Sequence, residues 1–325
     1  MTLQKNIRLT LFGLLLSAAS SALHAQSATV GSEAEKSRQV IQDERQMSQT
    51  QKEALESDTG VQQVVERKKS KFGGFVGASF SYFYRDNALS VNEPIGDIIS
   101  SDVITLSGYG AFSYGPFKFM NGIITPYAGF AQTAFRHQED EVDFADYDNQ
   151  RVYLLGEWKN RNGWKILPKF DYNRNISEED DSEEYKAFAP SIEVEKSFPI
   201  DNQSKFMASL KTAYNYTEID DFGVTGRTDD QLDNWSNSVS VNYYRQMLDV
   251  FVLNGYGLLI HKNYDKGQNS SREDFLKIIG GSVSYSYNIF RASLFSTYTE
   301  RDSDDDLNEF DNWDAGLNLS ATYTF

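Results

Sequence analysis

Twelve long stretches of this sequence alternate apolar and polar residues, and this repeat of two constrains the fold more than any other feature. In a β-strand, successive side chains point to opposite faces, so each stretch predicts a strand with one apolar and one polar face. Most stretches hold about 10 to 15 residues, longer than the strands of most soluble proteins and long enough to cross a bilayer at a tilt. They cover 72–85, 103–114, 124–136, 149–158, 164–175, 185–198, 204–218, 233–245, 250–262, 274–287, 290–301 and 311–325.

The connections between these stretches alternate between short and long. The short ones include KNRNG (159–163) and PIDNQ (199–203), and the long ones are acidic, as in ISEEDDSEE (176–184) and ERDSDDDLNEFD (300–311). An even number of strands with short periplasmic turns and long outer loops is the layout of outer-membrane barrels. The sequence therefore predicts an all-β fold, a transmembrane antiparallel up-and-down β-barrel of about twelve strands over 72–325. One connection, 115–123, is longer than expected for a periplasmic turn.

Composition agrees with this prediction. The mean hydropathy of -0.52 is that of a soluble protein, but the strands of a membrane barrel average to neutral hydropathy because their two faces differ. Aromatic residues make up 14% of the chain and there is no cysteine, so no disulfide holds the fold. The net charge of -16 argues against nucleic acid as a partner, since phosphate binding needs clustered Lys and Arg.

The first 25 residues predict a signal peptide. Lys5 and Arg8 precede the apolar stretch LTLFGLLLSAASSAL, and small residues offer a cleavage point near Ala25. Export across the inner membrane follows from this prediction.

Residues 26–71 predict a short periplasmic extension that is helical in part or disordered. Val40, Met47, Ala54 and Val61 recur every seven residues, but the second apolar position of the heptad is mostly missing. One interpretation is a helix that pairs with itself or with a periplasmic partner; the other is a solvated linker. Four cations at 67, 68, 69 and 71 would then lie against anionic headgroups of the inner leaflet.

The last strand ends the chain on an aromatic residue. In GLNLSATYTF, the apolar residues of one parity include Leu319, Ala321, Tyr323 and Phe325. This pattern resembles the assembly signal of bacterial outer-membrane β-barrel proteins, whose closing strand ends in Phe and is read by the barrel-insertion machinery. The resemblance implies a Gram-negative outer membrane as the location, and that machinery, membrane lipid and lipopolysaccharide as partners.

The hairpin around KNRNG (159–163) predicts a register in which the numbers of paired residues sum to 322. This register places Trp158 opposite Trp164 as a membrane girdle. On the other face it joins two pairs of opposite charge, Glu157 with Lys165 and Arg151 with Asp171. The same parity predicts a charged lumen lining on four consecutive strands. Its residues are Arg151, Glu157, Lys165, Lys169, Asp171, Glu193, Glu195 and Lys211. They would either select solutes or form a salt-bridged plug.

Metal and catalytic motifs are not convincing. Asp302, Asp304 and Asp306 begin like an EF-hand loop, but Leu307 and Trp313 occupy the positions that need glycine and a bidentate acid. We therefore expect no metal site and no cofactor, and at most loosely bound divalent cations that bridge acidic loops to lipopolysaccharide.

The mature chain holds two histidines. His137 lies near Asp140, as in outer-membrane aspartyl-type proteases, but the arrangement is not distinctive, and Gln138 and Lys262 rather than Ser follow His137 and His261. We expect no catalytic residues and no enzyme; a membrane-embedded hydrolase is the least favoured interpretation.

Two functions stay open at this point. The first is a porin-like passive channel whose acidic extracellular loops form a cation-preferring mouth. The second is a non-conducting structural or surface-interaction barrel with a plugged lumen, which bears a weak resemblance to solitary autotransporter-type barrels. The discriminating feature is whether the lumen is open.

Overall fold

The structure, a computed structural model, describes residues 71–90, 98–178, 181–219, 228–248 and 250–325. The predicted signal peptide and the predicted extension up to residue 70 lie outside these ranges, so both stay predictions. The long strands are β1 (Phe72–Arg85), β2 (Ser101–Tyr114), β4 (Gly122–His137), β5 (Tyr147–Asn160), β6 (Trp164–Ser177), β7 (Glu183–Pro199), β8 (Ser204–Ile219), β9 (Asn234–Met247), β10 (Phe251–Tyr264), β11 (Glu273–Tyr287), β12 (Phe290–Ser303) and β13 (Phe310–Thr324).

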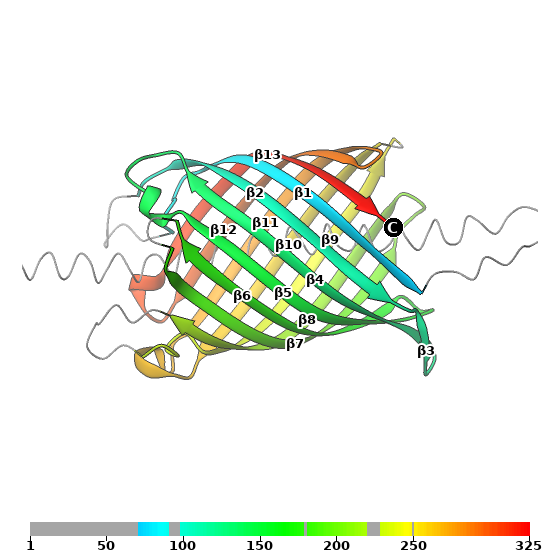
Figure 1. Cartoon of the computed structure of the whole chain (residues 1–325), viewed down its shortest axis with the longest axis horizontal. Helices are drawn as coiled ribbons and strands as arrows, with labels where there is room; N and C mark the ends of the chain where they lie inside the picture. The colour runs from blue at the N-terminus through cyan, green and yellow to red at the C-terminus, as the bar shows by residue number, and fades with distance from the viewer. Residues whose placement is uncertain (1–70, 91–97, 179–180, 220–227, 249) are drawn as a thin grey trace, which may run out of the picture.

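These twelve strands close into one antiparallel barrel (Figure 1). Each strand pairs with its neighbour along the chain, β2 pairs directly with β4, and the first strand pairs with the last from Phe75↔Thr324 to Arg85↔Asp314. Closure leaves no unpaired edge in the wall, which a sheet needs in order to span lipid. The predicted fold class is confirmed, and each predicted stretch coincides with a strand.

The long connection near residue 115 contains an additional short strand. β3 (Phe117–Phe119) pairs only with the start of β4 and projects beyond the end of the wall (Figure 1). The indole Nε1 of Trp158 donates a hydrogen bond of 3.2 Å to the carbonyl oxygen of Phe119, which holds this projection against β5. The added hairpin explains why this turn is longer than the others.

Two of the other short turns are closed by local side-chain caps. Asn160 Oδ1 accepts hydrogen bonds from the backbone N–H of Asn162 and Trp164, at 2.9 and 3.1 Å, and Gly163 supplies the left-handed backbone with φ of 77°. Asp201 Oδ1 similarly accepts from the N–H groups of Gln203 and Ser204. The hydrogen bond from Gln203 holds the pKa of the Asp201 carboxyl below its usual range.

At the long-loop end, the described residues form only short 3-10 turns, at Asp143–Ala145, Gly267–Asn269 and Asp306–Asn308. Among the described residues, no helix is long and apolar enough to cross a membrane.

The outer surface of the barrel is an apolar band. Leu106, Leu154, Leu210, Ile279 and Leu294 face outward from five strands, and each is more than half exposed. So large an exposed apolar surface is typical of contact with lipid.

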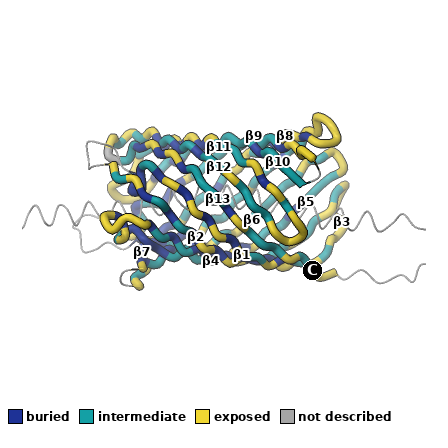
Figure 2. The backbone as a smooth tube through the Cα atoms, turned by 90° about the horizontal axis from the view of Figure 1, so that it is seen from above, coloured by how far each residue is buried: buried dark blue, intermediate teal, exposed yellow. Residues whose placement is uncertain are grey.

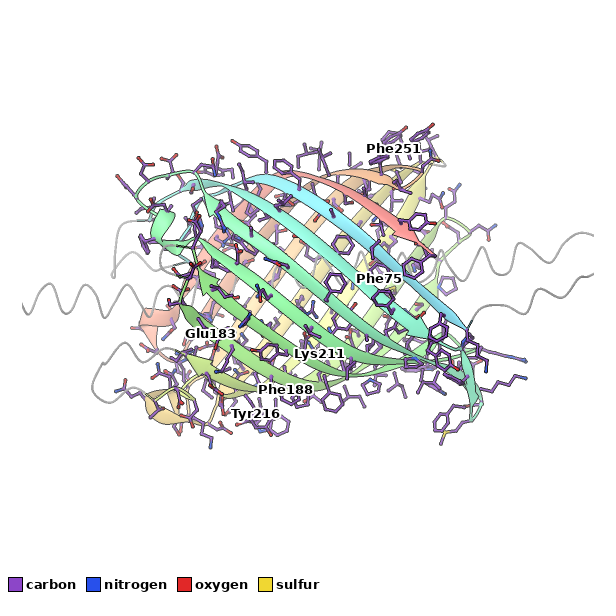
Figure 3. All side chains as sticks on the ribbon, viewed as in Figure 1. Phe75, Glu183, Phe188, Lys211, Tyr216 and Phe251 are labelled. Carbon is purple, nitrogen blue, oxygen red and sulfur yellow. The ribbon has the colours of Figure 1, made fainter. Side chains whose placement is uncertain are left out.

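Aromatic side chains border this band at both ends. Near the long loops they include Phe188 and Tyr216, whose rings stack with centroids 6.4 Å apart, and Phe251 lies at the opposite end (Figure 3). The exposed outward rings near the long loops are Tyr84, Tyr172, Phe188, Tyr216, Trp235, Phe275 and Trp313, and those near the short turns are Tyr114, Trp164, Phe198, Phe206, Tyr285, Tyr287, Phe290 and Tyr323. Two such girdles mark the two membrane–water interfaces of an outer-membrane barrel.

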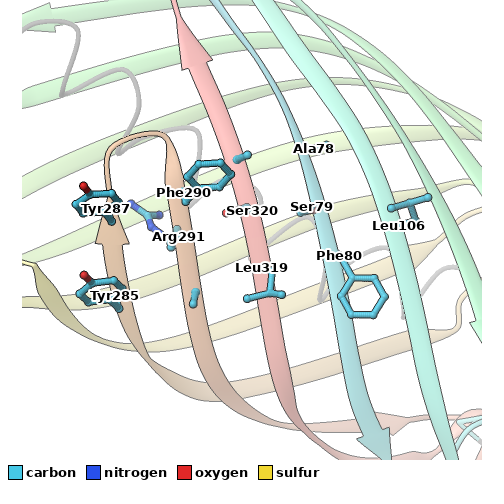
Figure 4. Close-up of a pocket in the computed structure, with 12 residues that line it drawn as sticks. Ala78, Ser79, Phe80, Leu106, Tyr285, Tyr287, Phe290, Arg291, Leu319 and Ser320 are labelled. Atoms are coloured by element: carbon cyan, nitrogen blue, oxygen red, sulfur yellow. The ribbon is translucent and has the colours of Figure 1, made fainter.

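A shallow groove crosses the closure seam on the same outer wall (Figure 4). Its lining includes the small side chains of Ala78 and Ala321 and the larger ones of Phe80, Leu319 and Tyr285. Its apolar lining continues the lipid-facing band.

Candidate functional site in the lumen

Buried residues are concentrated toward the long-loop end of the barrel (Figure 2). There, each of the twelve long strands carries a buried inward-facing residue. We call this set the outer ring; its members are Arg85, Val103, Phe135, Tyr147, Asn175, Ala187, Thr217, Asn234, Lys262, Asp274, Arg301 and Asp314. Toward the short turns, many inward residues are partly exposed instead, and Lys205 and Lys211 are exposed. The lumen wall is therefore tight at one end and more open at the other.

Part of the outer ring is aromatic. Phe135 and Tyr147 stack with ring centroids 4.6 Å apart, and both belong to one buried cluster with Val103 and Phe83. Phe83 meets Phe295 edge to face at 5.9 Å. Because these strands place their aromatic side chains at inward parity, the apolar part of the ring is built on the wall formed by β1, β2, β4, β5 and β12.

The rest of the ring is ionic. Arg85 Nε and Nη2 donate to the two carboxylate oxygens of Asp314 at 2.9 and 3.0 Å. On the far side of β13, Asp274 is completely buried and accepts a hydrogen bond of 2.6 Å from Ser303 Oγ. Arg272 and Arg301 approach the same carboxylate at 3.1 and 3.6 Å. A buried carboxylate with two guanidinium partners is stable only as an ion cluster.

Four inward aromatic residues lie against glycines directly opposite in the register, three of them through the ring and Phe83 through its Cβ. The pairs are Gly77 with Tyr109, Gly129 with Tyr153, Gly280 with Tyr256 and Gly316 with Phe83. A Cβ at Gly77 would come within 2.7 Å of the Tyr109 ring, so the ring covers the backbone there. Glycine at these positions lets bulky rings lie along the wall rather than across the lumen.

The predicted register of the β5–β6 hairpin is wrong by two residues. Paired residues sum to 324, so Trp158 lies opposite Ile166 and not opposite Trp164, and Lys159 lies opposite Lys165. The physical reason is the turn: with Gly163 in the left-handed conformation and Asn160 as its cap, the loop has three residues rather than five. A register shift of two residues leaves each side chain on the same face of the sheet, so both tryptophans remain on the outward face at the short-turn end.

The two predicted ion pairs change accordingly. Arg151 still binds Asp171, diagonally across the strands, with two hydrogen bonds of 2.7 Å. Lys165 is no longer opposite Glu157 in the register; it pairs with Glu195 of β7 at 3.0 Å and lies within electrostatic range of the buried Glu157. The sequence argument missed this partner because it considered one hairpin only, whereas a strand inside a barrel has two neighbours.

All eight predicted lining residues lie at inward parity, and the structure brings several of them together. Lys169 Nζ lies 2.9 Å from Asp171 and 4.7 Å from the ring centroid of Tyr153. Glu193 is opposite Lys211 in the register, but among the described residues neither takes part in an ion pair. Their role in solute selection stays a prediction.

Other lumen charges escaped the sequence analysis. They are Arg85, Lys159, Lys205, Lys262, Asp274, Arg291, Arg301 and Asp314, all at inward positions of their strands. Six of them lie on strands outside β5 to β8, where the same alternation would have found them, and Lys159 and Lys205 lie near the short-turn ends of β5 and β8.

The histidines do not form the arrangement considered from the sequence. His137 is buried and pairs with Asp146 rather than Asp140: its Nδ1 lies 2.9 Å from Asp146 Oδ1, which also accepts the His137 N–H. His261 stacks on Phe275 at 4.5 Å and contacts Glu273. Asp140 is therefore not the partner of His137, because the 3-10 turn at Asp143–Ala145 brings Asp146 back to β4.

The acidic segment 300–311, which begins within β12, is partly neutralised. Asp302 Oδ2 lies 2.6 Å from Lys277 Nζ on the outward face. In the described ranges, no group of three potential ligands is placed to hold a metal ion.

In the closing strand, Leu319, Ala321, Tyr323 and Phe325 all lie at outward parity. Phe325 exchanges two backbone hydrogen bonds with Gly74, of 2.9 and 3.0 Å, and its ring packs on Phe112. The last residue is thus part of the seam that closes the barrel.

Solved structures with a similar architecture are outer-membrane barrels. The translocator domain of the autotransporter NalP from Neisseria meningitidis is 7% identical, with 89% of this chain and 97% of that chain covered and a TM-score of 0.43. The β-domain of the Bordetella autotransporter BrkA is 10% identical, with coverage of 77% and 98% and a TM-score of 0.44, and a NanC porin is 10% identical, with 75% and 98% and a TM-score of 0.43. No protein-family model and no curated relative matches the chain.

A closed twelve-strand barrel, an outward apolar band between two aromatic girdles and a polar inward face together define a bacterial outer-membrane β-barrel protein. The protein is located in the outer membrane.

Proposed function

We propose that the protein is a porin-like passive channel for small hydrophilic solutes. The observation that supports this proposal most is the inward face of the inner half, where Lys211 is exposed and the adjoining wall carries serine and asparagine side chains such as Ser240 and Asn242. Exposed charges within a closed barrel are solvated by water, because a dry lumen would require them to be paired. The aromatic and ionic outer ring sets the narrowest passage. No catalytic residue belongs to this proposal.

The acidic loops favour cations at the mouth, as the sequence analysis expects. The lumen lining behind these loops carries more basic than acidic residues, so the charge of the mouth alone does not decide which ions pass.

A second candidate is a non-conducting structural barrel. The observation that favours it is the outer ring itself, since inward side chains are buried on every long strand at that end. The two candidates differ in one measurable property, which is ion conductance through the assembled barrel.

Planar-bilayer recordings of the purified full chain test the proposal. We expect discrete conductance steps, and we expect Phe83→Ala to enlarge them, because Phe83 is buried in the cluster that it forms with Val103, Phe135 and Tyr147 of the outer ring. Phe80→Ala is the matched control: it makes the same change on the same strand but on the lipid-facing side, and should leave the step size unchanged. Silent membranes with both the parent chain and Phe83→Ala would favour the structural barrel.

A further inference from the structure

The lumen carries a surplus of positive charge, although the whole chain has a net charge of -16. At inward positions of the long strands, ten basic residues face six acidic ones. The basic residues are Arg85, Arg151, Lys159, Lys165, Lys169, Lys205, Lys211, Lys262, Arg291 and Arg301, and the acidic ones are Glu157, Asp171, Glu193, Glu195, Asp274 and Asp314. Among the described residues, the inward face of the strands therefore carries a positive balance, opposite in sign to the net charge of the chain.

In the inner half, two of these cations have no carboxylate partner among the described residues. Lys211 is exposed to the lumen from β8 and makes no ion pair with Glu193 opposite it. Arg291, on β12, donates only to Ser286 Oγ, at 3.2 Å, and lies within electrostatic range of the hydroxyl groups of Tyr109 and Tyr244. Such cations keep their donors available for an anion.

At the outer ring, a single carboxylate interacts electrostatically with three cations. Asp274 lies within electrostatic range of Lys262 as well as Arg272 and Arg301. Arg301 is 3% exposed, and in the described part of the chain its Nε and Nη1 have no hydrogen-bond acceptor. Buried guanidinium donors without acceptors are costly, and an anionic group at this point would supply the acceptor.

We propose that the lumen is a pathway for anionic solutes, with one anion-binding step at Arg272 and Arg301 in the outer ring and another at Lys211 and Arg291 in the inner half. The inference rests on the proposed channel function and specifies its solute class. A narrow passage with low-dielectric walls focuses the field of its lining charges, so these charges act on a passing ion more strongly than the solvated acids of the loops, which salt screens.

The sign of the zero-current potential in a KCl gradient tests this inference, because it shows whether K⁺ or Cl⁻ permeates more easily. We expect anion preference for the parent protein. Lys211→Glu combined with Arg291→Gln should shift the potential toward cation preference. Lys277→Glu is the matched control, since Lys277 lies on the outward face and pairs with Glu300 and Asp302; it should leave the potential unchanged.

The possible outcomes distinguish failure of the anion-pathway inference from failure of the proposed channel function. Conductance with cation preference in the parent protein would overturn the inference and leave the channel intact. Absence of conductance would overturn both. A double variant that runs as an assembled, heat-modifiable barrel but keeps the parental zero-current potential would also overturn the inference. If this variant does not assemble, Lys211→Gln with Arg291→Gln provides a milder change that adds no negative charge.

Discussion

Replacing Tyr323 and Phe325 by serine is expected to remove the protein from the outer membrane, with degradation of the chain in the periplasm. Two causes act together. The changes abolish the aromatic pattern that resembles the barrel-assembly signal, and they remove the Phe325 ring from Phe112 at the closure seam. Deletion of Phe325 adds the loss of both backbone hydrogen bonds to Gly74. Fractionation with immunoblotting, and the heat-modifiable shift of a folded barrel on gels, measure the outcome.

A matched change on the opposite face of the same strand provides the control. Thr322→Ala and Thr324→Ala lie at inward parity and should leave the amount of assembled protein nearly unchanged. Normal membrane levels of the Tyr323 and Phe325 variant would show that the end of the chain is neither a signal nor a necessary part of the seam.

Asp274→Asn is expected to cause the largest loss of stability among single lumen substitutions. The carboxylate is fully buried and accepts from Ser303, while Arg272 and Arg301 lie within ion-pair distance. Removing its charge leaves buried cations without a counter-charge, and breaking a buried pair in this way costs roughly 3–5 kcal/mol. Urea unfolding in detergent, monitored by gel shift or tryptophan fluorescence, measures the change.

Two further variants make this result specific. Arg301→Gln added to Asp274→Asn should restore part of the stability, because it removes one of the stranded charges. Lys277→Ala breaks solvent-exposed pairs on the outer face and should cause no measurable loss. If Asp274→Asn unfolds like the parent protein, the carboxylate is hydrated and the outer ring is wider than its burial indicates.

The sequence predicted the barrel well because alternation and turn length are local signals. The repeat of two located each strand, and Leu319, Ala321, Tyr323 and Phe325 shared the lipid-facing parity as expected. The register of a hairpin is less local. It depends on the conformation of its turn, and the left-handed Gly163 shortened the loop that the Trp158–Trp164 pairing assumed.

The contents of the lumen were predictable only in part, because they depend on contacts between strands far apart in the chain. Arg85 and Asp314 meet only because the first strand closes on the last, and Glu195 binds Lys165 from the strand beyond the hairpin. The predicted cation preference came from the acidic loops at the mouth, which carry no information about the charges inside the barrel. A sum over the chain cannot show that the inward parity carries a basic surplus.

The central claim is that a water-filled lumen lies behind a lipid-facing wall, and two adjacent residues test it most directly. Leu210 is 61% exposed on the outward face of β8, and Lys211 faces the lumen from the next position. The chain has no cysteine, so single variants Leu210→Cys and Lys211→Cys report one position each. In liposomes, a charged water-soluble maleimide should label Lys211→Cys quickly and Leu210→Cys hardly at all. Labelling of Leu210→Cys alone would contradict the assignment of the faces, and protection of both would show that the lumen holds no water at this depth.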